Sequence, residues 1–475
     1  MKTMKGSEAK MLRDIDLQSI QEVRNYLEEA KTAQKIMAKM NQSEIDHIVE
    51  SMVKAAREEA ERLAAMAVEE TGFGNVPDKT VKNLFAANDV YNSIKDVKTV
   101  GIIRRDEENR VWEVAQPVGI VAGIVPSTNP TSTVIFKSLI AVKAGNAIIF
   151  SPHPAAAKCT TEAARIMQEA AERAGAPKGL IFCITKPTLA ATNELMKHKL
   201  TDVILATGGP GLVRAAYSSG KPAYGVGPGN VPVYIHESAN IEKAVELIIE
   251  SKTFDYGTIC ASEQALLVDE SIKEKVVAEM TKQGAYFLNE EEKRKVESII
   301  LVNGGLNAKI VGKSPQVIGE MAGIEVPSEA KVIVAEETGV GKEYPFSIEK
   351  LSPTLAFYTV KDMQAASELA QKLLDAGGLG HTVGIHAEDE KVIEAYTIDK
   401  PAGRIIVNAG TTFGAIGATV NVKPSLTLGC GAIGNNVTSD NVTVNHLFNI
   451  KRVAFGVRQM PKKEESAQNE PALTK

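Results

Sequence analysis

Apolar side chains recur every three or four positions between residues 17 and 40, and again between residues 43 and 70. This spacing predicts amphipathic helices at the start of the chain. Asn41, followed three residues later by Glu44, has the sequence of a capping box and indicates where one helix ends and the next begins.

Residues 98–116 follow a different pattern. Two stretches of β-type composition flank the polar sequence Asp-Glu-Glu-Asn at 106–109, which predicts a hairpin. A projecting hairpin has unpaired edges and usually acquires a partner strand.

From residue 118 onward, short runs that are apolar on both faces alternate with helical stretches. This alternation is typical of a parallel sheet covered by helices on both sides, so we predict an α/β fold. The first set of expected strands lies at 118–125, 147–150, 180–184, 203–206 and 231–235. A second set, at 264–268, 331–335, 354–358, 382–386 and 404–408, indicates a second α/β domain.

Length and composition agree with more than one domain. A chain of 475 residues is too long for a single hydrophobic core. Its apolar content of 44% and charged content of 24% are ordinary for a globular protein. The net charge of −5 gives no electrostatic reason to expect nucleic acid or an anionic membrane as a partner, and no apolar run is long enough to span a bilayer.

The cysteines and the chain ends bear on location. Cys159, Cys183, Cys260 and Cys430 lie far apart without a Cys-x-x-Cys pair, which argues against a disulfide scaffold and against a zinc site. The first residues lack the apolar core of a secretory signal, so we expect a cytoplasmic protein. No bound metal is expected. Residues 459–475 are polar and are predicted to be disordered.

Cys260 is the strongest candidate for chemistry. It lies among small and polar residues at 258–264, whereas Cys159 and Cys183 fall within helical and strand patterns and are expected to be structural. About 35 residues upstream, the glycine-rich turn Tyr-Gly-Val-Gly-Pro-Gly-Asn (224–230) contains no acid. A Cys nucleophile without a nearby general base would form a thioester but hydrolyse it slowly, which suggests acyl transfer to another thiol.

Four other features have both a structural and a functional interpretation. The Thr207–Gly211 turn joins a predicted strand to a helix, where glycines and a helix N-terminus can hold phosphate, although many such turns are purely structural. Asn129, after the first buried strand, is either a turn former or an amide donor to a developing oxyanion. His381 is either structural or a proton shuttle, and Glu349 is either a surface acid or a functional group.

Eight segments, taken in order, resemble those of the CoA-acylating aldehyde dehydrogenases, a branch of the aldehyde dehydrogenase superfamily. The resemblance covers roughly residues 15–455 and also extends to the aldehyde half of bifunctional alcohol/aldehyde dehydrogenases. The segments are Pro-Ser-Thr-Asn-Pro-Thr (126–131), Ser-Pro-His-Pro (151–154), Ala-Thr-Gly-Gly-Pro-Gly (206–211), Tyr-Gly-Val-Gly-Pro-Gly-Asn (224–230), Cys-Ala-Ser-Glu-Gln (260–264), Glu-x-Leu-Ser-Pro (349–353), Gly-His-Thr (380–382) and Ser-Leu-Thr-Leu-Gly-Cys-Gly (425–431).

The resemblance implies two Rossmann-like α/β domains with a β-hairpin oligomerisation arm. The implied nucleotide-binding domain comprises residues 1–97 and 117–228, the catalytic domain 229–436, and the arm 98–116 and 437–458. The implied reaction converts a short-chain aldehyde and CoA to acyl-CoA with NAD, or with NADP. Acetaldehyde is the default substrate; propionaldehyde, succinate semialdehyde and sulfoacetaldehyde are alternatives. A homodimer or homotetramer is expected.

The resemblance also implies roles for individual residues. Cys260 would be the nucleophile, Asn129 and the Cys260 backbone N–H would form the oxyanion hole, and His381 would be a candidate catalytic residue. Glu349 would hold the nicotinamide ribose. The full set implied for the cofactor is Thr128, Ser151, Pro152, Thr207, Gly208, Gly209, Gly227 and Glu349.

Two departures from the hydrolytic members of the superfamily are informative. Where those members carry a water-activating Glu, this chain reads Gly225-Val226-Gly227-Pro228, which favours thiolysis by CoA. Where they carry a Lys, this chain has Ser151, which leaves the choice between NAD and NADP open.

Two alternatives remain at this point. One is a Cys-dependent reductase on the same fold that acts on an acyl phosphate; the segments at 260–264 and 428–431 favour the CoA branch instead. The other is a non-catalytic oligomeric scaffold, against which the presence of Cys260, Asn129 and Glu349 argues.

Overall fold

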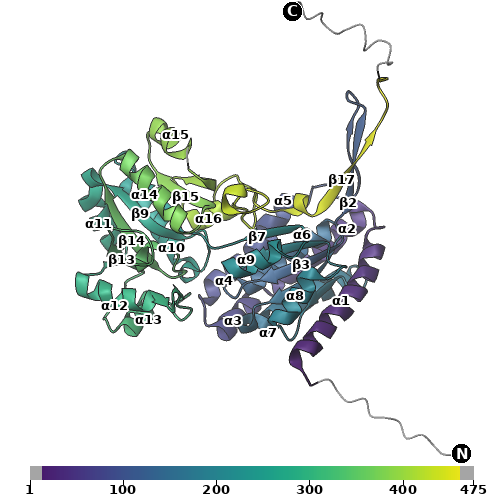
Figure 1. Ribbon diagram of the computed structural model, residues 1–475, viewed down its shortest axis with the longest axis horizontal. Helices are drawn as coiled ribbons and strands as arrows, with labels where there is room; N and C mark the ends of the chain where they lie inside the picture. Colours follow the sequence, from purple (N-terminus) through teal and green to yellow (C-terminus); the bar gives the residue numbers. More distant parts are fainter. Residues whose placement is uncertain (1–12, 399, 461–475) are drawn as a thin grey trace, which may run out of the picture.

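The computed structural model describes residues 13–398 and 400–460. Figure 1 shows two α/β bodies side by side and an arm of strands that projects away from them. The tail predicted to be disordered, 459–475, lies outside the described residues except for its first two positions.

The chain begins with the helices predicted from its apolar spacing. Asn41 caps the second helix: its side chain accepts from the Glu44 N–H at 3.0 Å, and the Glu44 carboxylate accepts from the Asn41 N–H at 2.8 Å. The predicted helix at 43–70 is interrupted at Glu59, whose φ of −101° and ψ of 3° are not helical. The helices of this region are α1 (Ile15–Met37), α2 (Gln42–Glu58), α3 (Ala60–Thr71), α4 (Val76–Phe85) and α5 (Tyr91–Ile94).

A parallel sheet of five strands, in the order β5-β4-β3-β6-β7, forms the core of the first body. Its strands are β3 (Ile120–Val125), β4 (Ala147–Pro152), β5 (Ile181–Cys183), β6 (Val203–Thr207) and β7 (Ala223–Val226). Its helices are α6 (Pro130–Lys143), α7 (Ala157–Arg173), α8 (Leu189–Lys197) and α9 (Pro210–Tyr217). Every residue of α6 is buried, because this helix lies between the sheet and the N-terminal helices.

The expectation for the fifth strand of this sheet was wrong. The run at 231–235, grouped above with the first set, forms β8 (Val231–Ile235) in the other sheet. The edge strand is instead β7, which lies within the stretch interpreted as a glycine-rich turn. Glycine content obscured a strand there, because glycine is depleted in strands on average.

The second body contains a parallel sheet of seven strands, in the order β10-β13-β14-β9-β8-β15-β16. Besides β8, its strands are β9 (Glu263–Asp269), β10 (Ala285–Phe287), β13 (Val332–Glu336), β14 (Thr354–Val360), β15 (Gly380–His386) and β16 (Ala402–Val407). Its helices are α10 (Ile241–Thr253), α11 (Lys273–Lys282), α12 (Glu290–Ile300), α13 (Pro315–Ala322), α14 (Met363–Ala376), α15 (Glu390–Ile398) and α16 (Thr411–Ile416). The two α/β bodies confirm the predicted fold class, and the exact domain limits stay a prediction.

A small hairpin accompanies the second body: β11 (Leu301–Val302) pairs with β12 (Gly305–Leu306). Neither it nor β10 was expected from the apolar pattern, because each is only two or three residues long.

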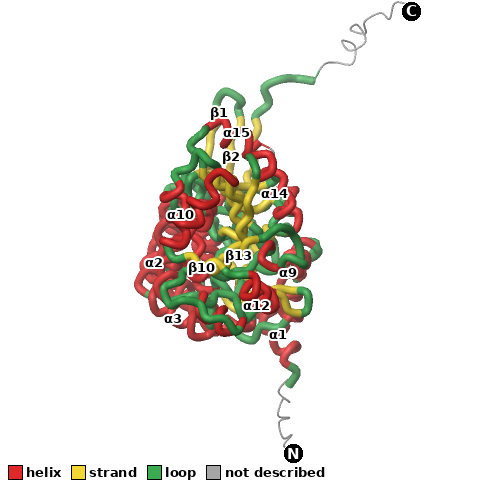
Figure 2. The backbone as a smooth tube through the Cα atoms, turned by 90° about the vertical axis from the view of Figure 1, so that its left-hand side faces the viewer, coloured by secondary structure: helices red, strands yellow, loops and turns green. Residues whose placement is uncertain are grey.

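The projecting arm is a three-stranded antiparallel sheet, visible at the top of Figure 2. The predicted hairpin is formed by β1 (Gly101–Asp106) and β2 (Val111–Pro117). The C-terminal strand β17 (Phe448–Ala454) pairs with β2 over its whole length and supplies the expected partner strand. Almost all of β17 is exposed in the single chain, including Ile450 and Val453.

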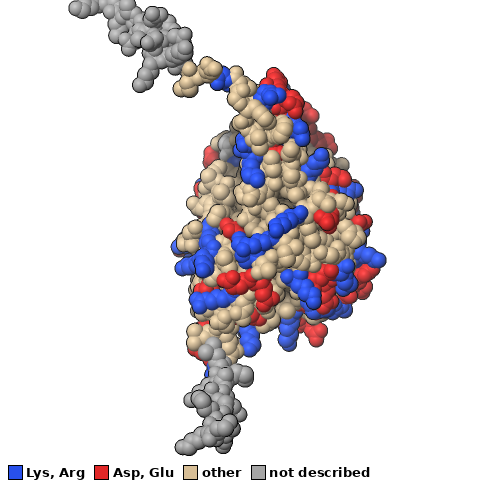
Figure 3. Space-filling model, turned by 90° about the vertical axis from the view of Figure 1, so that its right-hand side faces the viewer, with Lys and Arg blue, Asp and Glu red and all other residues tan. Residues whose placement is uncertain are grey.

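Basic and acidic side chains are interspersed over the face shown in Figure 3. None of the described helices is both long enough and apolar enough to cross a membrane. All four cysteines are free thiols; Cys159 and Cys183 are buried, as predicted, and so is Cys430, whereas Cys260 is partly exposed.

Candidate active site

A cavity of about 520 Å³ lies where the carboxyl ends of the first sheet meet the second body. Loops that follow parallel strands lie at one edge of a sheet, so residues far apart in sequence converge there. Ten of the eleven residues predicted from the sequence line this cavity: Thr128, Asn129, Ser151, Pro152, Thr207, Gly208, Gly209, Gly227, Cys260 and Glu349. The eleventh, His381, lies behind Cys260.

Cys260 is held by a tight backbone arrangement just before β9. The preceding residues Asp255, Tyr256 and Gly257 all have positive φ, at 48°, 51° and 71°. The segment of Gly229 packs directly against this turn: a Cβ atom at position 229 would lie 2.1 Å from the Cys260 carbonyl oxygen. Glycine is therefore required at 229 by close backbone approach.

His381 is positioned to exchange a proton with Cys260. Its Nε2 lies 3.2 Å from the Cys260 Sγ, and its Nδ1 lies 2.9 Å from the Thr382 hydroxyl. With the ring proton on Nδ1, the ring donates to Thr382 and offers Nε2 as an acceptor to the thiol. The Arg404 guanidinium donates to the His381 carbonyl oxygen at 2.9 Å and holds the same segment.

Burial disfavours the charged form of both members of this pair. Burial raises the pKa of the Cys260 thiol to about 12, and the negative charge of Glu349 adds to that effect. Burial lowers the pKa of His381 to about 3, helped by the positive Arg404. These shifts favour a neutral thiol next to a neutral imidazole, so we expect proton transfer to accompany bond formation instead of preceding it.

The Asn129 carboxamide is fixed from one side. Its Oδ1 accepts from the Lys82 ammonium at 2.6 Å, so its Nδ2 is the group on the other side. Nδ2 lies 3.1 Å from the Thr128 hydroxyl and 3.4 Å from the Thr258 carbonyl oxygen. Because Thr258 is two residues before Cys260, the amide donor faces the segment that carries the thiol.

Glu349 lies in the cavity wall and is not a surface acid. Its Oε1 accepts from the Gly229 N–H at 2.9 Å. Burial raises the pKa of Glu349 to about 7, although that hydrogen bond and the nearby Lys252 and Lys350 act in the opposite direction. The carboxyl group therefore changes its charge near neutral pH.

The segment 225–228 faces the cavity only in part. Val226, Gly227 and Pro228 line it, and a Cβ atom at Gly227 would point into open space. A Cβ atom at Gly225 would instead lie 2.9 Å from the side chains of Tyr217 and Val213 on α9. A side chain at 225 would therefore be directed away from Cys260.

Several polar residues at the site were missed by sequence reasoning. Lys137 on α6 is completely buried and donates to the carbonyl oxygens of Ile124 and Leu205, at 2.7 and 2.9 Å, beneath the cavity. Lys79 and Lys82 on α4 are buried as well. A lysine in a helical pattern is usually on the surface; only Lys137, inside the apolar run Val-Ile-Phe-Lys-Ser-Leu-Ile, carried a signal of burial.

Comparison with known proteins shows relatives along nearly the whole chain. The bifunctional aldehyde-alcohol dehydrogenase AdhE of Escherichia coli (strain K12) is 46% identical over 447 residues, which are 93% of this chain and 50% of that protein. The succinate-semialdehyde dehydrogenase (acetylating) of Clostridium kluyveri is 37% identical over 434 residues, 91% of this chain and 95% of that protein. The chain thus spans about half the length of the aldehyde-alcohol dehydrogenases and nearly all of the second relative.

Solved structures of aldehyde dehydrogenases are also similar to this chain. A crystal structure of an acetylating aldehyde dehydrogenase from Geobacillus thermoglucosidasius has 89% sequence identity and a TM-score of 0.95, covering 95% of this chain and 100% of that one. A propionaldehyde dehydrogenase from Rhodopseudomonas palustris, with bound CoA and an acylated cysteine, has 28% identity and a TM-score of 0.84, covering 91% and 97%. The profile of the Aldehyde dehydrogenase family matches residues 1–294. The chain therefore belongs to the aldehyde dehydrogenase family.

Proposed function

We propose that this protein is a CoA-acylating aldehyde dehydrogenase, which converts a short-chain aldehyde, NAD and CoA to acyl-CoA and NADH through a thioester on Cys260. The observation that carries the proposal is the setting of Cys260. Its thiol reaches a cavity whose lining includes one carboxylate, Glu349, and a backbone N–H already occupies one oxygen of that carboxylate. Such a site can form a thioester, and His381, whose pKa is lowered to about 3, is too weak a base to activate water, which is a far weaker acid than a thiol.

In the first half-reaction, the Cys260 sulfur forms a bond to the aldehyde carbon as its proton passes to His381 Nε2. The carbonyl oxygen becomes an oxyanion, which the Asn129 Nδ2 group and the Cys260 N–H stabilise by hydrogen bonding. A nicotinamide dinucleotide supplies the hydride acceptor when it is bound along this cavity. Loss of hydride from the thiohemiacetal carbon leaves the Cys260 thioester, and His381 releases to solvent the proton that it took from Cys260, so that its ring is neutral again before the second half-reaction.

The residues around the cavity fit a dinucleotide. Gly208 and Gly209 begin the turn into α9, and a Cβ atom at Gly209 would occupy open space in front of the backbone, where a phosphate can approach a helix N-terminus. Thr128, Ser151, Pro152, Thr207 and Gly227 would line the rest of the site, and Glu349 would hold the nicotinamide ribose. Among the lining residues that follow β4 there is no acid to repel a 2′-phosphate, so NADP is an acceptable alternative.

In the second half-reaction, the CoA sulfur forms a bond to the thioester carbon and the bond to the Cys260 sulfur breaks. The CoA thiol proton must be removed as it attacks, and the neutral His381 ring, 3.2 Å from the Cys260 Sγ, is the available acceptor. The Cys260 thiolate regains a proton from the same ring, which returns the site to its neutral state.

The cavity favours an uncharged aldehyde. None of the described residues that line it is Lys or Arg, and the helix N-terminus at Gly209, which can hold an anion, is assigned above to the dinucleotide phosphate. Succinate semialdehyde and sulfoacetaldehyde each carry a negative group that would be desolvated there without a partner, which is unfavourable. Acetaldehyde is therefore the proposed substrate, with propionaldehyde as the alternative.

The decisive experiment is a burst measurement with acetaldehyde and NAD⁺. Without CoA, we expect one equivalent of NADH per active site and a protein mass increased by one acetyl group; with CoA, we expect steady turnover. Cys260→Ser is the control and should give neither burst nor mass change. Sustained release of free acid without CoA, at the CoA-dependent rate, would contradict the proposal.

We also propose that the protein is a homo-oligomer assembled through the arm, because β17 exposes apolar side chains along a strand edge. Four free thiols are typical of proteins in a reducing compartment, and a cytoplasmic location is proposed on that basis.

A further inference from the structure

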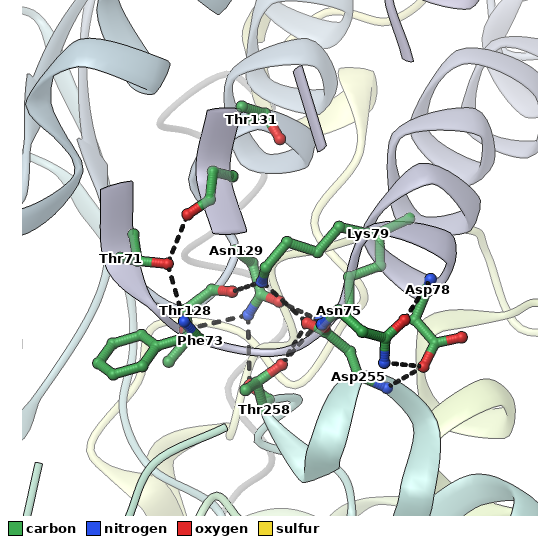
Figure 4. Close-up of polar contacts among 12 residues, drawn as sticks. Thr71, Phe73, Asn75, Asp78, Lys79, Thr128, Asn129, Thr131, Asp255 and Thr258 are labelled. Atoms are coloured by element: carbon green, nitrogen blue, oxygen red, sulfur yellow. Dashed lines mark hydrogen bonds and ion pairs between the residues drawn. The ribbon is translucent and has the colours of Figure 1, made fainter. Parts of the chain in front are cut away.

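A buried charge cluster lies between α4 and the segment that leads to Cys260. Lys79 and Lys82 are one turn apart on α4, and each side chain is only 3% exposed. Both ammonium groups donate to the same oxygen of Asp255, whose side chain is completely buried. Figure 4 shows Lys79, Asp255, Thr258 and Asn129 converging on this point.

Asp255 fixes the course of the backbone toward Cys260. Its Oδ1 accepts from the Asn75 N–H at 3.0 Å, and its Oδ2 accepts from the Thr258 hydroxyl at 2.6 Å. Its own N–H donates to Asp78 at 2.7 Å. A Cβ atom at Gly74, which has a φ of +71°, would lie 1.8 Å from the Asp255 carboxylate, so the neighbouring turn leaves room for that group. The left-handed backbone at Asp255 is therefore held by polar contacts on several sides.

Lys82 makes two further contacts that Lys79 does not make. Its ammonium donates to the Asn129 Oδ1 at 2.6 Å and to the Thr258 hydroxyl at 2.8 Å. Lys79 donates instead to the backbone carbonyl of Thr128, at 2.8 Å, and its hydrogen bonds do not include the Asn129 side chain. A lysine ammonium has only donors, so its contact with Asn129 must be to the amide oxygen.

We propose that Lys82 is a positioning residue for the oxyanion hole, which sets the orientation of the Asn129 carboxamide and ties it to the segment carrying Cys260. This inference rests on the proposed function. Without Lys82, the contact that still distinguishes the amide nitrogen from the amide oxygen is the long one, 3.4 Å, from Nδ2 to the Thr258 carbonyl oxygen, and no charged group would do so. The positive charge of the Lys82 ammonium next to Oδ1 also polarises the amide and strengthens Nδ2 as a donor.

The charge state of the cluster agrees with this role. The groups that face Lys82 are Asp255, Lys79 and Asp78, and Phe254 covers its remaining side. Burial lowers the pKa of Lys82 to about 8, and Asp255 opposes that effect. Lys82 therefore remains largely protonated at neutral pH, as its contact with the amide oxygen requires.

The test is a double-mutant cycle on CoA-dependent acetaldehyde oxidation. Lys82→Met keeps the length of the side chain and removes the donor; we expect kcat to fall on the order of 10- to 100-fold, with KM for acetaldehyde and NAD⁺ changed less than about threefold. Adding Lys82→Met to Asn129→Ala should lower kcat less than about threefold further, because the amide that Lys82 orients is gone. Lys82→Gln keeps a donor and should retain more activity than Lys82→Met.

Lys79→Met is the matched control. It removes a positive charge from the same Asp255 oxygen. If disturbing the charge cluster lowers kcat, Lys79→Met should lower it by the same factor in the wild-type and Asn129→Ala backgrounds. Thermal unfolding identifies variants that fold. If Lys82→Met does not fold, Lys82→Gln replaces it in the cycle, and its smaller loss must likewise vanish in the Asn129→Ala background.

The outcomes distinguish a failure of the proposed function from a failure of the inference about Lys82. Full activity of Asn129→Ala would remove the oxyanion role on which the proposed function relies. Loss of activity in Asn129→Ala, together with a folded Lys82→Met enzyme of normal kcat, would overturn the inference alone. A Lys82→Met loss of the same size in both backgrounds would also overturn it. A crystal structure of the Lys82 variant in which the Asn129 amide has rotated would support it directly.

Discussion

The resting state of Cys260 has a measurable consequence. With a pKa of about 12, the thiol is ionised to roughly one part in 10⁴ at pH 8, whereas an ordinary cysteine with a pKa near 8.5 is about one quarter ionised. Because the thiolate is the reactive species, alkylation of free enzyme by iodoacetamide should be on the order of 10³-fold slower than that of an exposed cysteine. The sign follows from burial, which disfavours the charged form.

The pH dependence of the alkylation rate distinguishes a neutral Cys260–His381 pair from a thiolate–imidazolium ion pair. The alkylation rate should rise about tenfold per pH unit from pH 8 to 10 without reaching a plateau, since the thiolate fraction rises at that rate below the pKa and Glu349, with a pKa of about 7, is already ionised there. His381, with a pKa of about 3, is neutral over this whole range and adds no step. The rate is measured by mass spectrometry of intact protein, with Cys260→Ser as the background control. A plateau below about pH 9 would refute the neutral-pair description, because it would show that the thiolate is stabilised at rest.

Three further predictions concern other parts of the molecule. Asn129→Ala should lower kcat for CoA-dependent oxidation on the order of 10²- to 10³-fold while leaving KM for CoA nearly unchanged, as steady-state kinetics would show; a loss under about threefold would make Asn129 a turn residue only. Gly227→Glu should introduce some CoA-independent release of acid, because that position faces the cavity, whereas Gly225→Glu should not, because its side chain is directed at Tyr217; assays of free acid compare the two, and equal rates would contradict the assigned directions. Deleting the hairpin tip at 106–109 should leave the fold intact by circular dichroism but weaken self-association by light scattering, and a monomeric wild-type protein at micromolar concentration would already disagree with the arm assignment.

Apolar patterns predicted most of the fold because strands buried on both faces have a clear sequence pattern. The runs at 203–206 and 354–358 became β6 and β14 with only small changes at their ends. The short elements β7, β10, β11 and β12 were missed for different reasons: β7 contains glycine, β10 has only three residues, and β11 and β12 have two each. Assigning 231–235 to the first sheet was wrong because the sequence of an apolar strand does not indicate which sheet the strand joins.

The residues that line the cavity could be identified because most of them follow predicted strands. What the sequence could not provide was the charge cluster behind Asn129. Lys82 and Asp255 are 173 positions apart, and each resembles an ordinary surface residue in its own segment. Burial of both arises only when α4 packs against the turn before Cys260, so the pairing depends on tertiary structure that no local pattern contains.

The pairing of β17 with β2 has a consequence for the order of folding during synthesis. The strands β3 to β7 lie within 120–226, so their sheet can assemble while the rest of the chain is still being made. The arm cannot assemble so early, because β17, the strand that completes it, is among the last described elements. Leu447, which precedes β17, accepts a hydrogen bond from Asn146, 301 positions earlier. Until then β2 offers one open edge to other nascent chains, and contacts so distant in sequence form slowly. If the protein assembles through the arm as proposed, that assembly has to wait until each chain has paired its own β17 with β2.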